Sequence, residues 1–264
     1  TLNTVMFSPE DLQLIKGEPQ LRRRFFDMQI AQTDKAYYEL LVKYNRLLLQ
    51  RNKLLKAIRD EGSGKEQLGL WDNELCTSAA LIVRKRLAAL DKLRAIASGI
   101  YASIAGSGEE LEIKYGLKTS GDFILEQEDK SEADWKDFYL QELKERQALD
   151  IMRGNTSIGP HRDDLFFYVN ERLLKAFGSQ GQQRSAALAL KLAQLEYVKN
   201  AVGEYPVLLL DDVMSELDAD RRTHLLKFID GKVQTFITVN DKHLIPDLNN
   251  NAYFYIENGK VTQG

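Results

Sequence analysis

The sequence has 264 residues, of which 44% are hydrophobic, 28% charged and 9% aromatic, with a formal net charge of −3. This is the composition of an ordinary globular chain, and the single cysteine, Cys76, excludes a disulfide framework and a cysteine-based zinc site. No apolar run approaches the roughly 20 residues that cross a bilayer, and no charged-then-apolar leader is present. We therefore expect no membrane partner and a reducing, cytoplasmic location. Because the chain starts at Thr1 in an extended run, we also expect it to be a fragment.

Charge is distributed unevenly along the chain. Residues 1–60 hold 11 Lys and Arg against 7 Asp and Glu, a net +4, and the stretch 43–59 contains six bases and no acid. Residues 105–150 reverse this balance, with 13 acids against 6 bases. This uneven distribution predicts a polarised surface, with separate basic and acidic regions, which the near-neutral total charge hides.

Helical periodicity dominates the first half. Apolar side chains between residues 26 and 60 recur at three- and four-residue steps, which predicts one long helix. The segment 61–65 breaks the pattern, and a second striped helix is expected over about 73–103. Two such helices joined by a short polar loop predict an antiparallel hairpin that is too short for a long coiled coil.

The second half predicts mixed structure. Val207–Leu210 is a short apolar run between Pro206 and two aspartates, which is typical of a fully buried parallel strand. A helix over 219–229 and a strand over 233–238 would complete a βαβ unit around it. The other expected elements are a strand at 111–115, a helix at 133–153, a hairpin of 164–169 with 172–177, a helix at 180–201 and a hairpin at 253–261 around Asn258-Gly259.

The segment from Tyr205 to Asp218 carries the strongest chemical signal. Its strand ends in Asp211 and Asp212, which places two carboxylates at the edge of a parallel sheet where α/β folds bind ligands. Asp211 would hold Mg²⁺, directly or through water, and Asp212 would orient or deprotonate an attacking water. Acids follow many buried strands, so the pair alone is equally consistent with a structural role. The sequence Ser215-Glu-Leu-Asp218 strengthens the functional interpretation because it resembles the D-loop of ABC-type ATPases.

A second segment, Phe177 to Arg184, opens the helix before this strand. Ser179 and Gln182 have the spacing of a capping box, so a well-capped helix is the simpler interpretation. The functional interpretation is an anion site, because Gly178 and Gly181 allow backbone N–H groups to approach a phosphate at a helix N-terminus. Ser179 could also donate to a phosphate oxygen.

Several basic side chains are candidates for sequence-independent contact with a phosphate backbone. A solvated basic face explains the same pattern equally well. Ile158–Asp164 combines a rigid turn with both charge signs, so His161 and Arg162 have either a structural role or one near nucleotide, an interface or DNA. The candidate DNA contacts are Arg46, Arg51, Lys53, Lys56, Arg84, Lys85 and Arg86, and the run 22–24 is a weaker one.

Four segments, FSPEDLQLIKGEPQLRRRFFD, GPHRDD, FGSQGQQR and LLLDDVMSELD, together resemble the RecF family of the ABC/SMC superfamily. The resemblance covers essentially the whole chain. It implies an α/β fold, an incomplete ABC/SMC-type, P-loop NTPase-like ATPase head with a helical-hairpin arm and signature lobe. The implied division is an edge strand at 1–9, the arm and signature lobe at 10–203 and the Walker B part at 204–264.

The resemblance also implies a function in DNA repair. Members bind ATP and Mg²⁺, form ATP-dependent homodimers, bind double-stranded DNA and single/double-strand junctions, and cooperate with RecR and RecO in gap repair. In such dimers the signature loop of one subunit, here Ser179, Gln180, Gly181 and Gln182, closes over ATP held by the other, with Asp218 near the seam. The alternatives are a non-enzymatic docking module for RecR or another partner, and another SMC-like head; the short hairpin disfavours the latter.

Two features depart from the family pattern. No G-x-x-x-x-G-K-[ST] motif is present, and the lookalike Gly62–Lys65 has Arg59 and Glu66 at the positions of the first glycine and the hydroxyl. We therefore expect this chain alone to be inactive and to bind no cofactor, or to bind ATP weakly. The switch histidine is also missing after residues 233–238, which leaves Asn240 or Asp241 as its replacement.

Overall fold

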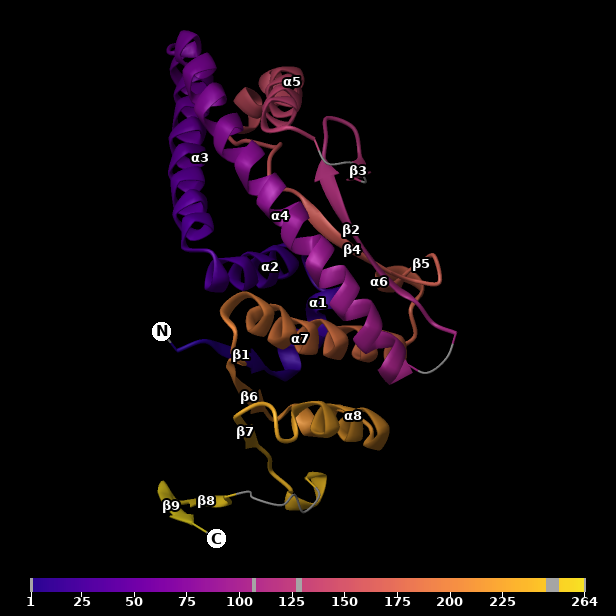
Figure 1. The fold of residues 1–264 in the computed structure, drawn as a ribbon. Helices are drawn as coiled ribbons and strands as arrows, with labels where there is room; N and C mark the ends of the chain where they lie inside the picture. The colour runs from indigo at the N-terminus through magenta and orange to yellow at the C-terminus, as the bar shows by residue number, and fades with distance from the viewer. Residues whose placement is uncertain (1, 106–107, 127–129, 246–251, 264) are drawn as a thin grey trace.

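The computed structural model describes residues 2–105, 108–126, 130–245 and 252–263 (Figure 1). The helices are α1 Gln13–Lys16, α2 Pro19–Thr33, α3 Lys35–Glu61, α4 Leu68–Ala105, α5 Glu132–Arg153, α6 Leu174–Phe177, α7 Gln180–Val202 and α8 Ala219–Ile229. The strands are β1 Thr4–Phe7, β2 Leu111–Lys118, β3 Phe123–Glu126, β4 Asp164–Val169, β5 Arg172–Leu173, β6 Val207–Asp211, β7 Thr235–Thr238, β8 Phe254–Glu257 and β9 Lys260–Gln263. Within these ranges, no helix is both long enough and apolar enough to span a bilayer.

Helices α3 and α4 form the expected antiparallel hairpin; α3 and the first part of α4 project with α5 beside them, and the rest of α4 runs across α7 (Figure 1). The prediction of one helix over residues 26–60 was wrong, because the chain breaks between α2 and α3 at Asp34. This residue has an extended backbone (φ −135°), and its carboxylate accepts a hydrogen bond from the Tyr37 N–H at 3.0 Å. An N-cap of this kind satisfies a free donor of the first helical turn, so the sequence starts a new helix there.

A buried cluster of charged side chains joins α3 and α4 of this arm to α5. The Arg51 side chain, from α3, is completely buried and donates to Asp72 of α4 at 2.6 Å. It also donates to Asp150 of α5 and to the Thr156 hydroxyl, both at 2.9 Å. The prediction that Arg51 contacts DNA was therefore wrong, because all of its charge faces the interior.

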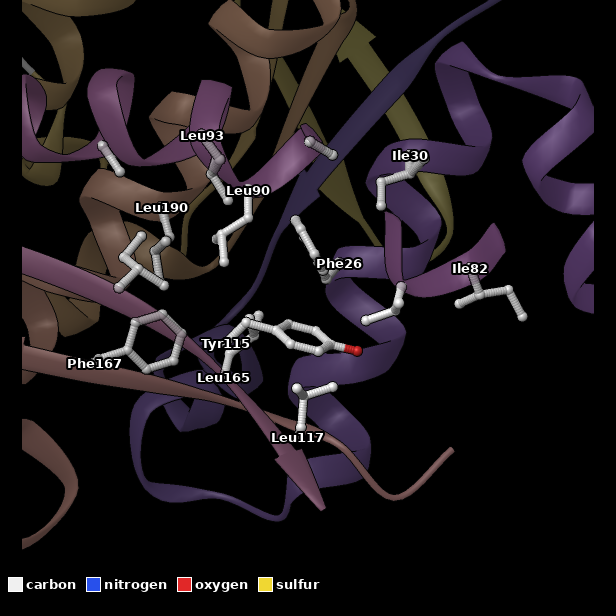
Figure 2. Packing of buried hydrophobic residues seen from close by; sticks show 14 of the residues in the cluster. Phe26, Ile30, Ile82, Leu90, Leu93, Tyr115, Leu117, Leu165, Phe167 and Leu190 are labelled. Atoms are coloured by element: carbon white, nitrogen blue, oxygen red, sulfur yellow. The ribbon is translucent and has the colours of Figure 1, made fainter. Parts of the chain in front are cut away.

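The second buried arginine joins the arm to the antiparallel sheet, in which the strand order is β3-β2-β4-β5. Arg86 of α4 holds both carboxylate oxygens of Asp27 at 2.9 Å and donates to the Tyr115 hydroxyl of β2 at 2.8 Å. The apolar part of Tyr115 packs in the adjoining core with residues from α2, α4, β4 and α7 (Figure 2). Arg86 is only 3% exposed, so its predicted DNA contact was also wrong.

The predicted hairpin after residue 164 is present in shortened form. Strands β4 and β5 pair through Asn170-Glu171, but β5 ends at Leu173 and residues 174–177 form a helical turn. Both turn residues have positive φ, 47° and 65°. At the C-terminus, Asn258 (φ 50°) and Gly259 (φ 77°) form the predicted turn between β8 and β9, where Asn-Gly favours a type I′ hairpin.

The parallel sheet has the order β1-β6-β7, so Thr4–Phe7 near the start of the chain pairs with Val207–Leu210 of β6. The prediction of a parallel strand at 207–210 is confirmed by its pairing on both sides, but full burial is not, because only Leu208 and Leu210 are buried in that run. One face of the sheet packs on α7 through Val5, Phe7, Leu208 and Leu210. The other face is open within the described part of the chain, where Met6 and Phe236 are 51% and 57% exposed.

Helix α7 lies between the two cores and is buried on nearly its whole circumference (Figure 1). Its Leu188, Leu192 and Leu195 belong to the sheet core, whereas Leu190 and the alanines around it belong to the core of the arm and the antiparallel sheet. A helix that is apolar all round is typical of such a central position. The middle of the helix, from Ala186 to Val198, is therefore held between both cores.

Replacing Arg51 tests the buried ion cluster. Arg51→Met keeps the volume but leaves the Asp72 and Asp150 carboxylates without their counter-charge, and we expect it to lower the free energy of unfolding by about 3–5 kcal/mol. Lys53→Met, at an exposed position of the same helix, should change it by less than about 0.5 kcal/mol. Urea unfolding followed by circular dichroism measures both, and equal stabilities of the two variants would contradict the account.

Candidate functional site

The two candidate catalytic carboxylates lie at the carboxyl end of β6. The Asp211 Oδ1 accepts a hydrogen bond from the Thr238 hydroxyl at 2.7 Å, and the Asp212 backbone N–H donates to the same hydroxyl oxygen at 3.0 Å. Thr238 ends the neighbouring strand β7, so one side chain fixes both acids relative to the sheet. The structure thus brings Asp211 and Asp212 together at the edge where the sequence predicted them.

The backbone at this edge is unusual. Asp212 has φ 50°, in the left-handed region that a non-glycine residue seldom adopts, and this turns the chain away from the strand direction. Its Oδ1 atom is buried and accepts no hydrogen bond from the described residues. A buried carboxylate oxygen without a donor suits a cation or a water molecule, so the acids fit a Mg²⁺ site.

The loop before α7 has the geometry that its sequence predicted. Ser179 is the N-cap: its hydroxyl accepts from the Gln182 N–H at 3.1 Å, and its own N–H donates to the Gln182 side chain at 2.9 Å. Ser179 and Gln180 are exposed, and Gly181 and Gln182 are half-buried. Their position at the N-terminus of a 23-residue helix favours an anionic ligand.

Arg221, which the sequence analysis did not single out, joins this loop to the segment after β6. Its side chain donates to the Gly181 carbonyl at 3.0 Å and to the Ser185 hydroxyl at 2.9 Å. The same guanidinium pairs with Asp218, the N-cap of α8. The predicted seam residue and the predicted phosphate loop are therefore held together by one arginine.

A second link connects the loop with the arm. Gln182 donates to Glu109 at 2.8 Å, and the Tyr101 hydroxyl donates to the other oxygen of Glu109 at 2.7 Å. Tyr101 lies near the end of α4, whose opposite end forms the arm with α3. The role of Glu109 was not predicted from the sequence, because the residue follows a helix in an acidic stretch that carries no motif.

In the turn at residues 158–164, His161 has a structural role. The His161 Nε2–H donates to the Thr156 carbonyl at 3.1 Å, so its Nδ1 accepts the Tyr44 hydroxyl at 2.6 Å. Desolvation of the ring lowers the pKa of His161 to about 3, which keeps it neutral. Gly159 permits the packing: it has φ 130°, and a Cβ there would lie 2.4 Å from the Tyr44 hydroxyl. Among the described residues, the side chain of the exposed Arg162 makes only long contacts, to the Thr156 carbonyl.

The remaining basic candidates divide by their partners. Arg46, Lys53 and Lys56 are exposed on α3, and no ion pair involves them among the described residues. Arg84 lies 3.8 Å from Glu132, and Lys85 is paired with Asp34, so their charges are partly neutralised. The lookalike loop Gly62–Lys65 joins α3 to α4 at the tip of the arm, as expected, and follows no strand.

Asn240 and Asp241 were the proposed replacements of the switch histidine. Among the described residues, neither makes a hydrogen bond to the Asp211 or Asp212 side chain. Asp241 instead accepts from the His243 N–H at 2.9 Å, and Asn240 is exposed. Thr238 makes the contact to Asp211. Thr238 therefore positions Asp211 at the end of β7, and the assignment of the switch role to Asn240 or Asp241 stays a prediction.

Comparison with known proteins gives a consistent result, although no family model matches. The chain is 45% identical to the DNA replication and repair protein RecF of Natranaerobius thermophilus, over 90% of this chain and 62% of that protein. It is 40% identical to the RecF protein of Ligilactobacillus salivarius, over 99% of this chain and 69% of that protein. The chain belongs to the RecF family.

Solved structures agree with this assignment. The chain superposes with a TM-score of 0.88 and 39% identity on a structure of the recombination mediator protein RecF with ATP in the RecFOR pathway, covering 99% of this chain and 67% of that one. The same values are found for the RecF-ATPrS structure, of which it covers 68%. The expected fold class, an ABC/SMC-type head with a helical arm, is confirmed. The chain spans 62% of the length of several curated RecF proteins that it matches.

The neutral histidine makes stability depend on pH. Because the pKa of His161 is lowered from 6.5 in the unfolded chain to about 3, the unfolded state binds an extra proton in acid, and the stability that His161 contributes is lost as pH falls from 6.5 towards 3. We expect the free energy of unfolding of the native chain, relative to His161→Gln, to fall by about 1–2 kcal/mol between pH 7 and pH 5. Burial raises the pKa of the neighbouring Asp163 to about 6, an opposing effect present in both proteins. Parallel pH curves in urea unfolding would contradict the assignment.

The Arg221 contacts make a local prediction for the RecF-family loop. Arg221→Met removes the hydrogen bonds to Gly181 and Ser185, and we expect the amides of Gln182 and Gln183 to exchange with deuterium about tenfold faster. Arg222→Met changes the next residue of the same helix, makes no such contact in the structure and serves as the control. Unchanged protection in the Arg221 variant would mean that the capping box alone holds the loop.

Proposed function

We propose that this chain acts as part of a RecF-type DNA-repair ATPase, in which its signature loop closes over ATP held by a second subunit. Its own acids would serve ATP bound on their side of the dimer. The proposal includes ATP-dependent homodimerisation, binding of double-stranded DNA and of single/double-strand junctions, and cooperation with RecR and RecO in gap repair. The proposal places this activity in the cytoplasm.

The observation that supports the proposal most is the connection of two phosphate-related segments by Arg221. Ser179 and Gly181 present a capped helix N-terminus, and Asp218 of the following segment lies beside them through the arginine. A lone capped helix or a lone acidic strand end would each be ordinary. Their fixed arrangement on one chain, with Asp211 and Asp212 on the adjoining sheet edge, suits a surface that closes on a triphosphate.

The acids and the loop would act on opposite sides of the bound nucleotide. Asp211 would help to hold Mg²⁺, which supplies neutralisation of the phosphate charge when bound. Asp212 would orient or deprotonate the attacking water, held in place by Thr238 through its backbone. Ser179, Gln180, Gly181 and Gln182 would donate to the γ-phosphate from the opposite subunit, in the manner of a preorganised anion site.

The exposed bases of the arm are proposed to contact DNA. Arg46 and Lys53 are seven residues apart on α3, which puts them on one face of the helix. Lys56, Arg84 and Lys85 extend the basic surface, whereas Arg51 and Arg86 no longer belong to it. We propose the same three-part division, with an edge strand at 1–9, the arm and signature lobe at 10–203 and the Walker B part at 204–264. The pairing of β1 with β6, next to β7, supports it.

Joining the chain to the Walker A-bearing N-terminal segment of a RecF relative allows the dimer to be tested. Ser179→Arg fills the space at the helix N-terminus and removes the hydroxyl cap, so we expect ATP-dependent self-association to weaken at least about tenfold in analytical ultracentrifugation. Ser63→Arg, at an exposed serine in the loop between α3 and α4, is the matched control. Dimerisation that survives Ser179→Arg, or RecR binding that needs no nucleotide, would favour the docking-module alternative.

A further inference from the structure

Helix α2 meets α3 near the start of α3 (Figure 1). Two adjoining hollows lie in this region. The larger, of about 540 Å³, is formed by α2, α3, α4 and the turn at Pro160-His161, and Arg23 and Arg24 line it. The smaller, of about 450 Å³, is formed by α3 alone and is lined by Lys43 and Arg46. Tyr38 lines both and is 57% exposed, so it separates two basic hollows along one track.

Lys43 lies 3.7 Å from Glu74, whereas the arginines of this track are largely free to bind an anion. Arg23 donates one hydrogen bond, to the Asp163 carbonyl at 2.8 Å. Within the described part of the chain, the side chains of Arg24 and Arg46 make no hydrogen bond or ion pair. The nearby acidic side chains are paired with other bases. Both oxygens of Asp27 are held by Arg86, and Glu39 lies 3.7 Å from Lys35.

Electrostatics around Arg23 point the same way. Desolvation lowers the pKa of Arg23, and the positive charges of Arg86 and Arg162 lower it further. The carboxylates of Asp164 and Asp163 oppose this shift in part. Guanidinium groups crowded in this way repel one another, and a bound phosphate would relieve that repulsion. Planar arginines are well suited to this role because they donate in parallel to phosphate oxygens.

The centre of the track is aromatic and apolar. The exposed ring of Tyr38 stands beside Met28, itself 51% exposed, and Leu41 in the larger hollow. Base stacking on such side chains is the usual way in which proteins hold single strands, because every base has a π-face. A duplex, whose bases remain stacked in the helix, would present only its polar backbone to this surface.

We propose that this track binds one unpaired DNA strand, with phosphates at Arg23, Arg24 and Arg46 and a base stacked on Tyr38. Tyr38 and Arg46 are eight residues apart, or about 12 Å along α3, so the site would hold only a few nucleotides. The inference rests on the proposed DNA-repair function and deepens it. The exposed Lys53 and Lys56, further along α3, would bind the duplex, and the track would bind the adjoining single strand at a junction.

The test is fluorescence anisotropy of this chain with labelled single-stranded DNA, a blunt duplex and a duplex with a single-stranded tail. We expect Tyr38→Ala to weaken binding of the single strand and the tailed duplex about tenfold, with blunt-duplex binding changed less than about twofold. Tyr38→Phe should retain the preference. Tyr255→Ala, at a tyrosine 49% exposed on β8, is the matched control.

A second pair of variants tests the phosphate contacts. Arg24→Gln should weaken single-strand binding and lower the salt slope of the affinity by about 0.7, the value for one phosphate contact on a single strand. Arg172→Gln, at an exposed arginine of β5, should leave both unchanged. Circular dichroism confirms that each variant is folded.

The outcomes separate this inference from the proposed function. If Tyr38→Ala weakens all three DNAs equally or none of them, while the native chain binds them, the track is not a single-strand site and the DNA-binding proposal stands. If the native chain binds no DNA, both proposals fail for this chain. If labelled ATP competes with single-stranded DNA at the track, and Arg24→Gln abolishes ATP binding, the occupant is a free nucleotide and the inference is overturned.

Discussion

The burial of α7 between two hydrophobic cores is the constraint on which the rest of the structure depends. Leucines on one side of the helix pack on the parallel sheet, and alanines and leucines on the other pack against α4 and the antiparallel sheet. Even its Lys191 is buried, and it is paired with Asp11 at 3.1 Å. Because the helix cannot move without disturbing both cores, its N-terminal loop is fixed relative to the sheet edge that carries Asp211 and Asp212.

Polar contacts extend this fixed relationship to neighbouring elements. Arg221 joins the N-terminal turn of α7 to the start of α8, and Glu109 joins it to the end of α4. Since α4 also forms half of the arm, one continuous helix connects the proposed DNA surface with the proposed phosphate loop. The contacts at both ends are specific hydrogen bonds, so a change at the arm has a physical route to the loop.

The sequence predicted the elements that have strong local signals. The capping box at Ser179, the parallel strand before Asp211 and the Asn258-Gly259 turn all depend on near neighbours, and each is found at its predicted place. The break at Asp34 was missed because apolar periodicity continues from α2 into α3, and one capping side chain overrides it. Asp34 itself is an N-cap residue type, which was the available signal.

Side-chain roles set by distant partners were out of reach. Arg51 and Arg86 look like members of a basic face, yet each is neutralised by acids far along the chain: Asp72 and Asp150 for the first, and Asp27 for the second. Thr238 and Arg221 have no motif, and their importance follows from which strand ends and helix starts the fold brings together. Charge density along a sequence therefore indicates a basic surface, but not which of its members are exposed.

The central claim is that the Ser179 loop serves ATP bound by the other subunit, whereas Asp212 serves ATP bound by its own. Subunit mixing tests this in the chain extended with a RecF N-terminal segment, using Ser179→Arg in one preparation and Asp212→Asn in the other. Each alone should be inactive. At protein concentrations high enough to drive both variants into dimers, an equal mixture should recover about a quarter of the native ATPase rate, because half of the dimers then contain one intact composite site. If both segments acted on the same bound nucleotide within one subunit, every site in the mixture would remain defective. An inactive mixture that still dimerises would contradict the account.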